Sequence, residues 1–231
     1  MKRPAEANDE SPQLSILIAA ERLFGQIGYD KTTVADIARE LSMSSSNVYR
    51  FFSAKAAINE AVARRLLAAM EADVDIFVRQ PGLARERLRA LLGAIETANQ
   101  GRFISDRKLH RLLEASFSEN WRAARDHVER VIDLLGEIIS QGVRDGEFGV
   151  DDCQLAAILV HDACVRFWHP RLMMEGPEAP RPTLDQMLDF CLAALAQGAS
   201  VTKLDPFKGT RPARSEWTTA ARELGSAQAS S

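Results

Sequence analysis

The fold is decided by residues 33–52, TVADIARELSMSSSNVYRFF. Thr33 followed three residues later by Asp36 has the spacing of a capping box, so it predicts the start of a short helix. The polar run of residues 42–44 predicts a turn, and a second short helix is expected over residues 45–51. Two short helices joined by so tight a turn are the pattern of a helix-turn-helix.

The two helices of this motif need a shared apolar seam on one side. The residues expected in that seam are Val34, Ile37, Ala38, Leu41, Met43, Val48, Phe51 and Phe52. The residues left on the outward face of the second helix are Ser45, Ser46, Asn47, Tyr49 and Arg50. A face this short and polar suits the base edges and phosphates of a DNA major groove. An ordinary solvated helix hairpin has the same spacing, so the pattern alone leaves both interpretations open.

Charge gives only local support to DNA binding. The 231 residues carry a net charge of −3, with 46% hydrophobic and 26% charged residues. These values exclude a wholly disordered chain and require any DNA affinity to come from a local patch. Four basic and two acidic side chains between Lys31 and Lys55 leave an excess of two positive charges there. So small an excess is weak evidence, because it equally serves solubility.

Helical periodicity continues on both sides of the motif, and no run shows strand alternation. We therefore expect an all-α chain of about nine helices. Before the motif we expect a helix over residues 14–27 that Gly28 stops. After the motif we expect a long helix that Ser53 caps and Pro81-Gly82 breaks, and then a helix that ends near Gln100-Gly101. The remaining expected helices are two between residues 103 and 143 that meet near Ser118, one over 151–169 and one over 183–197.

The sequence predicts a cytoplasmic protein with no membrane segment. No apolar run approaches the roughly 18–20 residues of a membrane span, and no stretch has the pattern of a signal peptide. The three cysteines, Cys153, Cys164 and Cys191, are widely spaced and form no CxxC motif. An odd, scattered set of this kind argues against a disulfide scaffold and fits a reducing compartment.

Catalytic and metal-binding motifs are missing from the sequence, which has no GxSxG, P-loop, HExxH or GxGxxG. Cys164 lies near His161 and Asp162, but residues three apart on one helix rarely converge on a substrate. The remaining histidines are too scattered to predict a metal site. We expect no enzyme, no cofactor and no metal, with an all-α enzyme or a helical protein-interaction scaffold as the alternatives.

Residues 16–67, ILIAAERLFGQIGYDKTTVADIARELSMSSSNVYRFFSAKAAINEAVARRLL, resemble the N-terminal DNA-binding domain of TetR-family transcriptional regulators. The residues that carry the resemblance are Phe24, Gly28-Tyr29, Thr32-Thr33, Ile37-Ala38, Tyr49, Phe52 and Lys55. The resemblance covers about a quarter of the chain. The sequence departs from the family pattern in having Ser42-Met43 for the usual Gly-Val, Ser45-Ser46 for Lys-Gly or Pro-Gly, and Ala54 for Pro.

The resemblance implies which residues touch DNA. It implies that Thr33 holds a phosphate through its hydroxyl and backbone N–H, and that Tyr49 and Lys55 each hold another. A simple core ring is the alternative role for Tyr49. The surface that the resemblance assigns to base reading is Ser44, Ser45, Ser46, Asn47 and Arg50. Within it, Arg50 suits guanine and Asn47 suits adenine.

The larger part of the chain is expected to dimerise and to bind a ligand. By their order, the helices near 151–169 and 183–197 correspond to the two that form the homodimer interface in TetR-like proteins. Alternatively, they only close the monomer core. The candidate pocket for a hydrophobic or aromatic effector gathers Phe103, His110, Phe117, Trp121, His127, His161, Cys164, Phe167 and Trp168, with His169 nearby. Aromatic residues at helical spacing are also ordinary core.

Taken with the resemblance, the sequence predicts four regions. They are a flexible N-terminus over residues 1–12, a helix-turn-helix DNA-binding domain over 13–56, a ligand-binding and dimerisation domain over 57–198, and a C-terminal tail over 199–231. The expected function is that of a one-component transcriptional regulator. In this interpretation it is a repressor that a small-molecule effector releases from a palindromic operator of double-stranded DNA.

Overall fold

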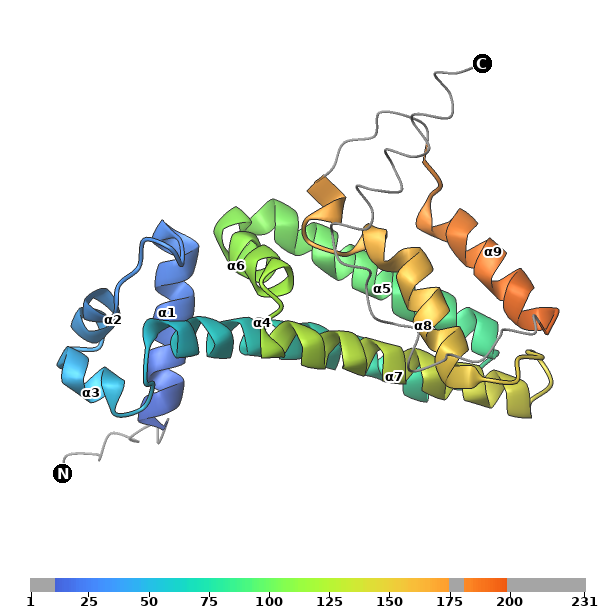
Figure 1. Cartoon of the computed structure of the whole chain (residues 1–231), viewed down its shortest axis with the longest axis horizontal. Helices are drawn as coiled ribbons and strands as arrows, with labels where there is room; N and C mark the ends of the chain where they lie inside the picture. The colour runs from blue at the N-terminus through green and yellow to red at the C-terminus, as the bar shows by residue number, and fades with distance from the viewer. Residues whose placement is uncertain (1–10, 175–180, 199–231) are drawn as a thin grey trace, which may run out of the picture. The chain divides into compact units, whose positions relative to one another are not determined.

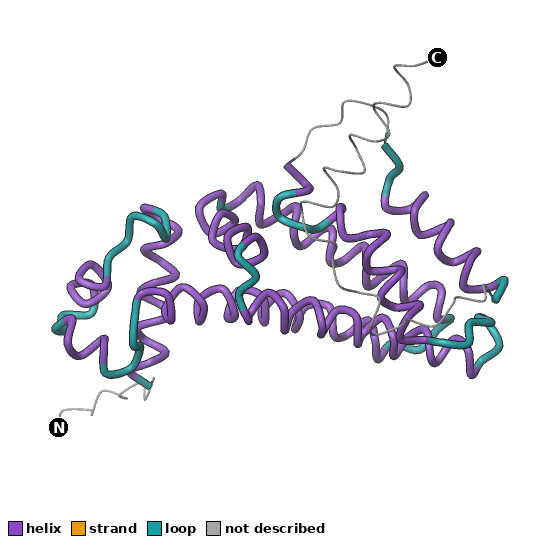
Figure 2. The backbone as a smooth tube through the Cα atoms, viewed as in Figure 1, coloured by secondary structure: helices purple, strands orange, loops and turns teal. Residues whose placement is uncertain are grey.

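The computed structural model describes residues 11–174 and 181–198. Within these ranges the chain forms nine α-helices, two short 3-10 helices and no strand, which confirms the all-α prediction (Figures 1 and 2). The α-helices are α1 (Pro12–Ile27), α2 (Val34–Glu40), α3 (Ser45–Tyr49), α4 (Lys55–Arg79), α5 (Ala84–Ser105), α6 (Arg107–Ser118), α7 (Arg122–Arg144), α8 (Cys153–Cys164) and α9 (Leu184–Ala196). The 3-10 helices are η1 (Val165–Phe167) and η2 (Leu172–Met174). The predicted tail over 199–231 and residues 1–10 of the predicted N-terminal segment lie outside the described residues.

Two helices begin at capping boxes, and the sequence predicts the one at Thr33. The Thr33 hydroxyl accepts from the Asp36 N–H at 3.1 Å, and the Asp36 carboxylate accepts from the Thr33 N–H at 2.9 Å. The same reciprocal pair joins Thr183 and Gln186 at the start of α9. These side chains satisfy N–H groups that have no partner within the helix, so each cap fixes where its helix starts.

Other boundaries differ from the predicted ones. Helix α5 continues past Gly101 to Ser105, because the chain breaks only at Asp106, whose carboxylate accepts from the first N–H groups of α6. Helix α8 ends at Cys164, short of the predicted residue 169, and passes into η1. Helix α3 ends at Tyr49 rather than at residue 51, and α4 starts after Ala54 without the side-chain cap expected from Ser53.

Helices α5 and α7 receive carboxylates from distant elements at their first turns. Glu147 accepts from the N–H of Ala84 at 2.7 Å and from that of Arg85 at 3.4 Å. Glu60 of α4 accepts from the N–H of Ala123 at 2.6 Å, and α7 has no cap from its own preceding side chain. Burial raises the pKa of Glu147, but the hydrogen bonds from Ala84 and Arg85 outweigh it and hold that pKa below its ordinary value.

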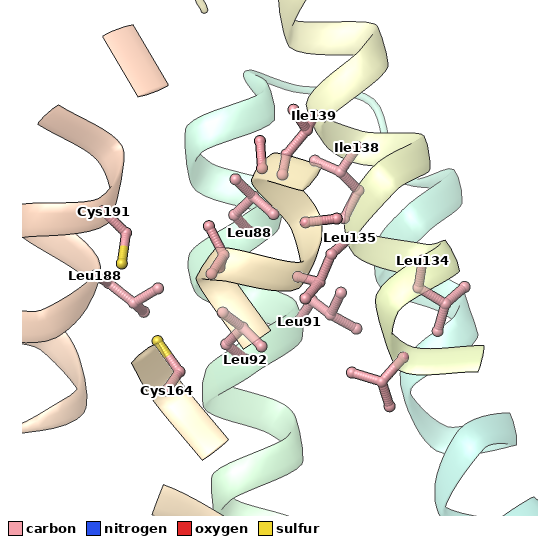
Figure 3. Close-up of a cluster of buried hydrophobic side chains, with 14 of the residues drawn as sticks. Leu88, Leu91, Leu92, Leu134, Leu135, Ile138, Ile139, Cys164, Leu188 and Cys191 are labelled. Carbon is pink, nitrogen blue, oxygen red and sulfur yellow. The ribbon is translucent and has the colours of Figure 1, made fainter. Parts of the chain in front are cut away.

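Two apolar clusters fill the interior. The first joins α1–α4 with α6 and the first turn of α7, and it includes Ile37, Val48 and Phe52 of the helix-turn-helix, as predicted. The second joins the end of α4 with α5, α7, α8 and α9, and Figure 3 shows leucines of α5 facing leucines and isoleucines of α7 in it. Helix α4 contributes to both clusters, so it connects the recognition motif to the rest of the bundle. Phe51, predicted in the seam, is instead 37% exposed.

Candidate functional site

The turn between α2 and α3 is closed by backbone contacts. The N–H of Met43 donates to the carbonyl of Ala38 at 2.9 Å, and the Met43 side chain is half-buried in the seam, as predicted. Ser42 has φ of +53°, a left-handed conformation that glycine adopts without strain and other residues adopt at a cost. This explains in physical terms why glycine is usual at the position where this chain has Ser42.

Helix α3 presents a polar face to solvent. Ser44 caps the helix by accepting from the N–H of Asn47 at 3.2 Å. Ser46, Tyr49 and Arg50 are exposed, Tyr49 by 51%, so the alternative of a core ring for Tyr49 is wrong. Among the described residues, Arg50 has no ion-pair partner, and its charge is therefore available to a ligand. Asn47 is half-buried, and its amide lies 3.8 Å from the Met43 sulfur.

Thr33 is occupied by its own cap. Its hydroxyl donates to Asp36 Oδ2 at 2.6 Å, and its backbone N–H donates to the same oxygen at 2.9 Å. These two hydrogen bonds lower the pKa of Asp36, which stays ionised beside them. A phosphate could use the donors expected of Thr33 only by displacing this carboxylate.

Lys55 stands at the start of α4, where the resemblance implies a phosphate contact. Its ammonium donates to the backbone carbonyl of Asp30 at 3.1 Å, which ties α4 to the loop after α1. An ammonium has three donors, so this bond leaves two hydrogens for a phosphate. Lys55 thus fixes the loop and can serve the backbone of DNA at the same time.

A second candidate site lies among helices α4–α8. It is a cavity of about 40 Å³ whose wall includes four of the predicted pocket residues, Phe117, His127, His161 and Trp168. His169 also lies in this wall. The wall residues that sequence reasoning missed are Leu67, Met70, Asn99, Leu113, Val128, Val131, Val165 and Pro170. Leu67 and Met70 lie on the inward stripe of α4, a signal that periodicity could have supplied.

Carboxylates fix two of the histidines in this wall. Nδ1 of His127 lies 2.7 Å from Oε1 of Glu71, and Nδ1 of His161 lies 3.0 Å from Oδ1 of Asp162. The Phe117 ring lies edge-on to the His169 ring, with centroids 5.2 Å apart. The cavity is therefore apolar and aromatic, with imidazole as its main polar chemistry.

The other predicted pocket residues lie elsewhere. Nε2 of His110 is bound to the carbonyl of Pro170 at 3.0 Å, and Trp121 donates to Glu119 at 2.9 Å beside the first apolar cluster. Phe167 packs against the second cluster, and the side chain of Phe103 lies outside the described part of the structure.

Cys164 also belongs to the second apolar cluster, where it meets Cys191 of α9 (Figure 3). Its hydrogen bond to Cys191, together with burial, raises the pKa of the Cys164 thiol. Periodicity cannot separate Cys164 from His161, because both lie on the inward side of α8 and only the neighbouring helices decide which surrounds each meets.

The outer face of α8 and α9 is apolar. Phe190 is 73% exposed and Leu159 is 46% exposed. Between the two helices lies an open hollow of about 310 Å³. Its lining is Val150, Ala156, Leu159, Val160, Ala163, Phe190, Cys191, Ala194 and Leu195. Large exposed apolar surfaces of this kind are typical of contacts with other molecules.

The described residues contain neither a cluster of metal ligands nor a helix that could span a membrane. In residues 11–174 and 181–198, no group of three histidine, cysteine or acidic side chains is placed to hold a metal ion. Over the same part of the chain, no helix combines the length and the hydropathy that crossing a membrane requires.

A capped helix-turn-helix joined by one long helix to an α-helical bundle defines a helix-turn-helix transcriptional regulator. The family model for bacterial regulatory proteins of the tetR family matches residues 16–62. The model for the tetracyclin repressor-like C-terminal domain matches residues 84–188. The chain belongs to the TetR family of DNA-binding transcriptional regulators.

Individual relatives are distant. The HTH-type transcriptional regulator BetI of Brucella abortus is 31% identical over 85 residues, which span 37% of this chain and 43% of that regulator. FadR of Bacillus subtilis, solved with stearoyl-CoA, has a TM-score of 0.56 at 16% identity, over 80% of this chain and 98% of that one. A TetR-family regulator of Pectobacterium atrosepticum has a TM-score of 0.57 at 17% identity, over 83% and 94%. The solved structures share the fold.

Proposed function

We propose that the chain is a homodimeric repressor, acting in the cytoplasm, that occupies a palindromic operator and leaves it when a small effector enters the cavity among α4–α8. The observation that carries the proposal is the pairing of two exposed faces on one chain. One is the polar face of α3 with Tyr49 and Arg50, and the other is the apolar face of α8 and α9 with Phe190.

The α3 face provides the contacts that a DNA duplex requires. Arg50 has the planar donor pair that matches the O6 and N7 acceptors of guanine. The Tyr49 hydroxyl and the free hydrogens of Lys55 suit phosphates on either side. Ser46 is exposed on the same face and can reach a base edge or a phosphate.

The α8–α9 face provides the second half of operator recognition. One helix of five residues reads too few bases to select a site by itself. A two-fold dimer presents two such helices about one DNA turn apart, and each helix then reads one half of a palindrome. Burial of Phe190 and Leu159 against the second copy removes the largest exposed apolar side chains of these two helices from water.

Release requires that the cavity and the recognition helix move together. Helix α7 is joined to α4 by Arg64 with Asp126 at 2.6 Å, by His127 with Glu71 at 2.7 Å, and by Arg130 with Asp75. The middle of these three links lies in the wall of the cavity. A ligand that shifts His127 therefore pulls on α4, which carries the helix-turn-helix at its other end.

The small size of the cavity indicates that it must change shape when an effector binds. Ligand pockets usually measure about 300–1,000 Å³, whereas this cavity measures about 40 Å³. An effector of ordinary size must therefore open this cavity into neighbouring space, and opening it shifts the wall residues that α4 and α7 contribute. An effector that favours the opened state by a few kcal/mol is sufficient to empty the operator. FadR of Bacillus subtilis, solved in complex with stearoyl-CoA, has the same fold, which supports a small-molecule effector for this chain.

The test is selection of binding sites from random duplex DNA by the purified full chain at physiological salt. The expected result is enrichment of a near-palindrome with half-sites about one helical turn apart. The Arg50→Ala variant is the control and should enrich a less defined half-site. If nothing is enriched, either with the protein alone or with added cell extract as a source of ligand, the proposed function is wrong.

A further inference from the structure

Two imidazole rings in the cavity wall have the same arrangement. His127 of α7 and His161 of α8 each line the cavity, and each has a carboxylate against Nδ1. An ionised carboxylate can only accept a hydrogen bond, so Nδ1 of each ring carries a proton. Nε2 of each ring has no hydrogen-bond partner within residues 11–174 and 181–198.

Such a ring presents the lone pair of Nε2 as a hydrogen-bond acceptor. The carboxylate behind Nδ1 fixes the orientation of the ring and keeps the Nδ1 proton in place, so a ligand donor meets Nε2. The matching ligand group is a weak oxygen acid. When its O–H meets Nε2, the O–H bond breaks and an N–H bond forms, which leaves a carboxylate beside an imidazolium with no change in total charge.

The other groups around the rings favour this assignment. The charged or titratable groups near the two rings are Glu71 from α4, Asp162 from α8 and His169 after η1. Arg125 and Glu129 of α7 line an adjoining hollow that is open to solvent. Helices α5 and α6 contribute only uncharged residues to the wall, namely Asn99, Leu113 and Phe117. No acidic side chain lines the cavity itself within the described ranges, so an incoming carboxylate meets no like charge there.

The available space fixes the size of the acid. A cavity of about 40 Å³ holds a group the size of a carboxylate, since one water needs about 10–15 Å³ by the same kind of measure. A second hollow of about 360 Å³ shares Phe117, Val128 and His169 with the cavity, so these three side chains form the partition between them. The outer hollow is open to solvent and has room for the body of a small organic molecule.

We infer that the effector is a small monocarboxylic acid with an apolar body, whose acid group is held by Nε2 of His127 and of His161 and whose body lies beside Phe117 in the outer hollow. Only the role of this acid as an effector rests on the proposed function, because the binding of the acid itself needs no DNA. The Phe117–His169 ring pair is the partition that must part for the acid group to enter.

The test is calorimetric titration of the free full-length protein with benzoate, phenylacetate and hexanoate at pH 8, in phosphate and in Tris. Benzamide, phenylacetamide and hexanamide are the matched neutral ligands. A carboxylate that binds as the acid brings a proton from the buffer, so the enthalpy should differ between the two buffers. The expected result is binding of at least one acid with proton uptake, at least tenfold more tightly than its amide.

Variants locate the effect. His127→Gln and His161→Gln should each weaken the acid at least tenfold and reduce proton uptake. His110→Gln changes the third buried histidine, which does not line the cavity, and the Gln amide can still donate to the Pro170 carbonyl, so this variant should leave both quantities unchanged. Glu71→Gln tests the same assignment without removing a ring, and it should reduce proton uptake. Circular dichroism establishes that each variant is folded.

The failures are distinguishable. If no acid binds, if amides bind as tightly, or if the His127→Gln and His161→Gln variants bind like the wild type, the inference is wrong even when operator selection succeeds. If an acid binds with proton uptake but does not release selected DNA, the inference about the cavity stands and the effector role in the proposed function is wrong.

Discussion

The two exposed faces of this chain differ in almost every respect. The recognition face rests on a helix of five residues, held by the Ser44 cap, and it exposes hydroxyl groups and the Arg50 guanidinium. The α8–α9 face rests on two helices of 12 and 13 residues and exposes Phe190 and Leu159. The two faces therefore suit different partners. The first exposes hydrogen-bond donors, which suit phosphates and bases, and the second exposes apolar area, which suits the second copy of the proposed dimer.

The largest effect is expected from Phe190→Asp. A charge at the centre of the apolar face should convert the dimer to a monomer, because burying an unpaired carboxylate is strongly unfavourable. Operator affinity should fall by about 100-fold or more, since the two half-sites are then no longer bound together. Light scattering after gel filtration and DNA titration measure the two effects.

Ile76→Asp is the matched control for Phe190→Asp. Ile76 is also a large, exposed apolar side chain, 58% exposed, and it lies on α4, outside the α8–α9 face. It should leave the dimer intact. A Phe190→Asp variant that stays dimeric would show that this face is not the interface.

Arg50→Ala should have the next largest effect. Loss of a bidentate contact to guanine costs about 1–3 kcal/mol and relaxes the preference at that base. The measurement is competition between operators that differ at single positions. An equal loss of affinity for every sequence would show that Arg50 contacts phosphates and not bases.

Lys55→Ala should weaken all DNA sequences alike. Removing one phosphate contact should lower the slope of log affinity against log salt concentration by about one. The dimer should be unaffected, so this variant should change DNA binding without changing dimerisation. An unchanged salt slope would show that Lys55 contacts no phosphate and only holds the Asp30 carbonyl.

Ser42→Gly should stabilise the recognition face slightly. Ser42 has φ of +53°, and relief of a left-handed conformation is worth about 1 kcal/mol. The midpoint of thermal unfolding should rise while the oligomeric state stays the same. A lower midpoint would mean that the Ser42 side chain makes a compensating interaction in the folded state.

The smallest effect concerns the stability of the fold at acid pH, to which Glu147 in the turn after α7 contributes. The pKa of Glu147 lies below its ordinary value of 4.5 in the folded chain, so its ionised form stabilises the fold above about pH 4.5. That contribution is lost as pH falls through the lowered value. Glu147→Gln should therefore be less stable than the wild type at pH 7, and the gap should narrow by pH 3. Urea midpoints at the two pH values measure it, and a constant gap would contradict this role.

Local signals are what the sequence could supply. The cap at Thr33, the cap at Thr183 and the stop at Gly28 each depend on residues within four positions, and the structure has all three. The polar face of α3 follows from the same short-range spacing. The helix order and the all-α class were predictable for this reason.

Long-range packing is what the sequence could not supply. His161 and Cys164 share the inward side of α8, yet one faces the cavity and the other meets Cys191 of α9. His110 has the burial expected of a pocket residue but is bound to the Pro170 carbonyl, 60 residues away. Which buried residues meet depends on helix crossings that no local pattern records.

The carboxylates that complete the first turns of α5 and α7 have a consequence for amide hydrogen exchange. Because Glu147 holds the N–H of Ala84 and Glu60 holds the N–H of Ala123, neither turn can fray without a displacement of a distant element. Protection at Ala123 therefore reports whether α4 and α7 remain joined, and protection at Ala84 reports whether the turn after α7 remains docked on α5. The exchange rates of these two backbone amides therefore report separately on motion at the two ends of the bundle.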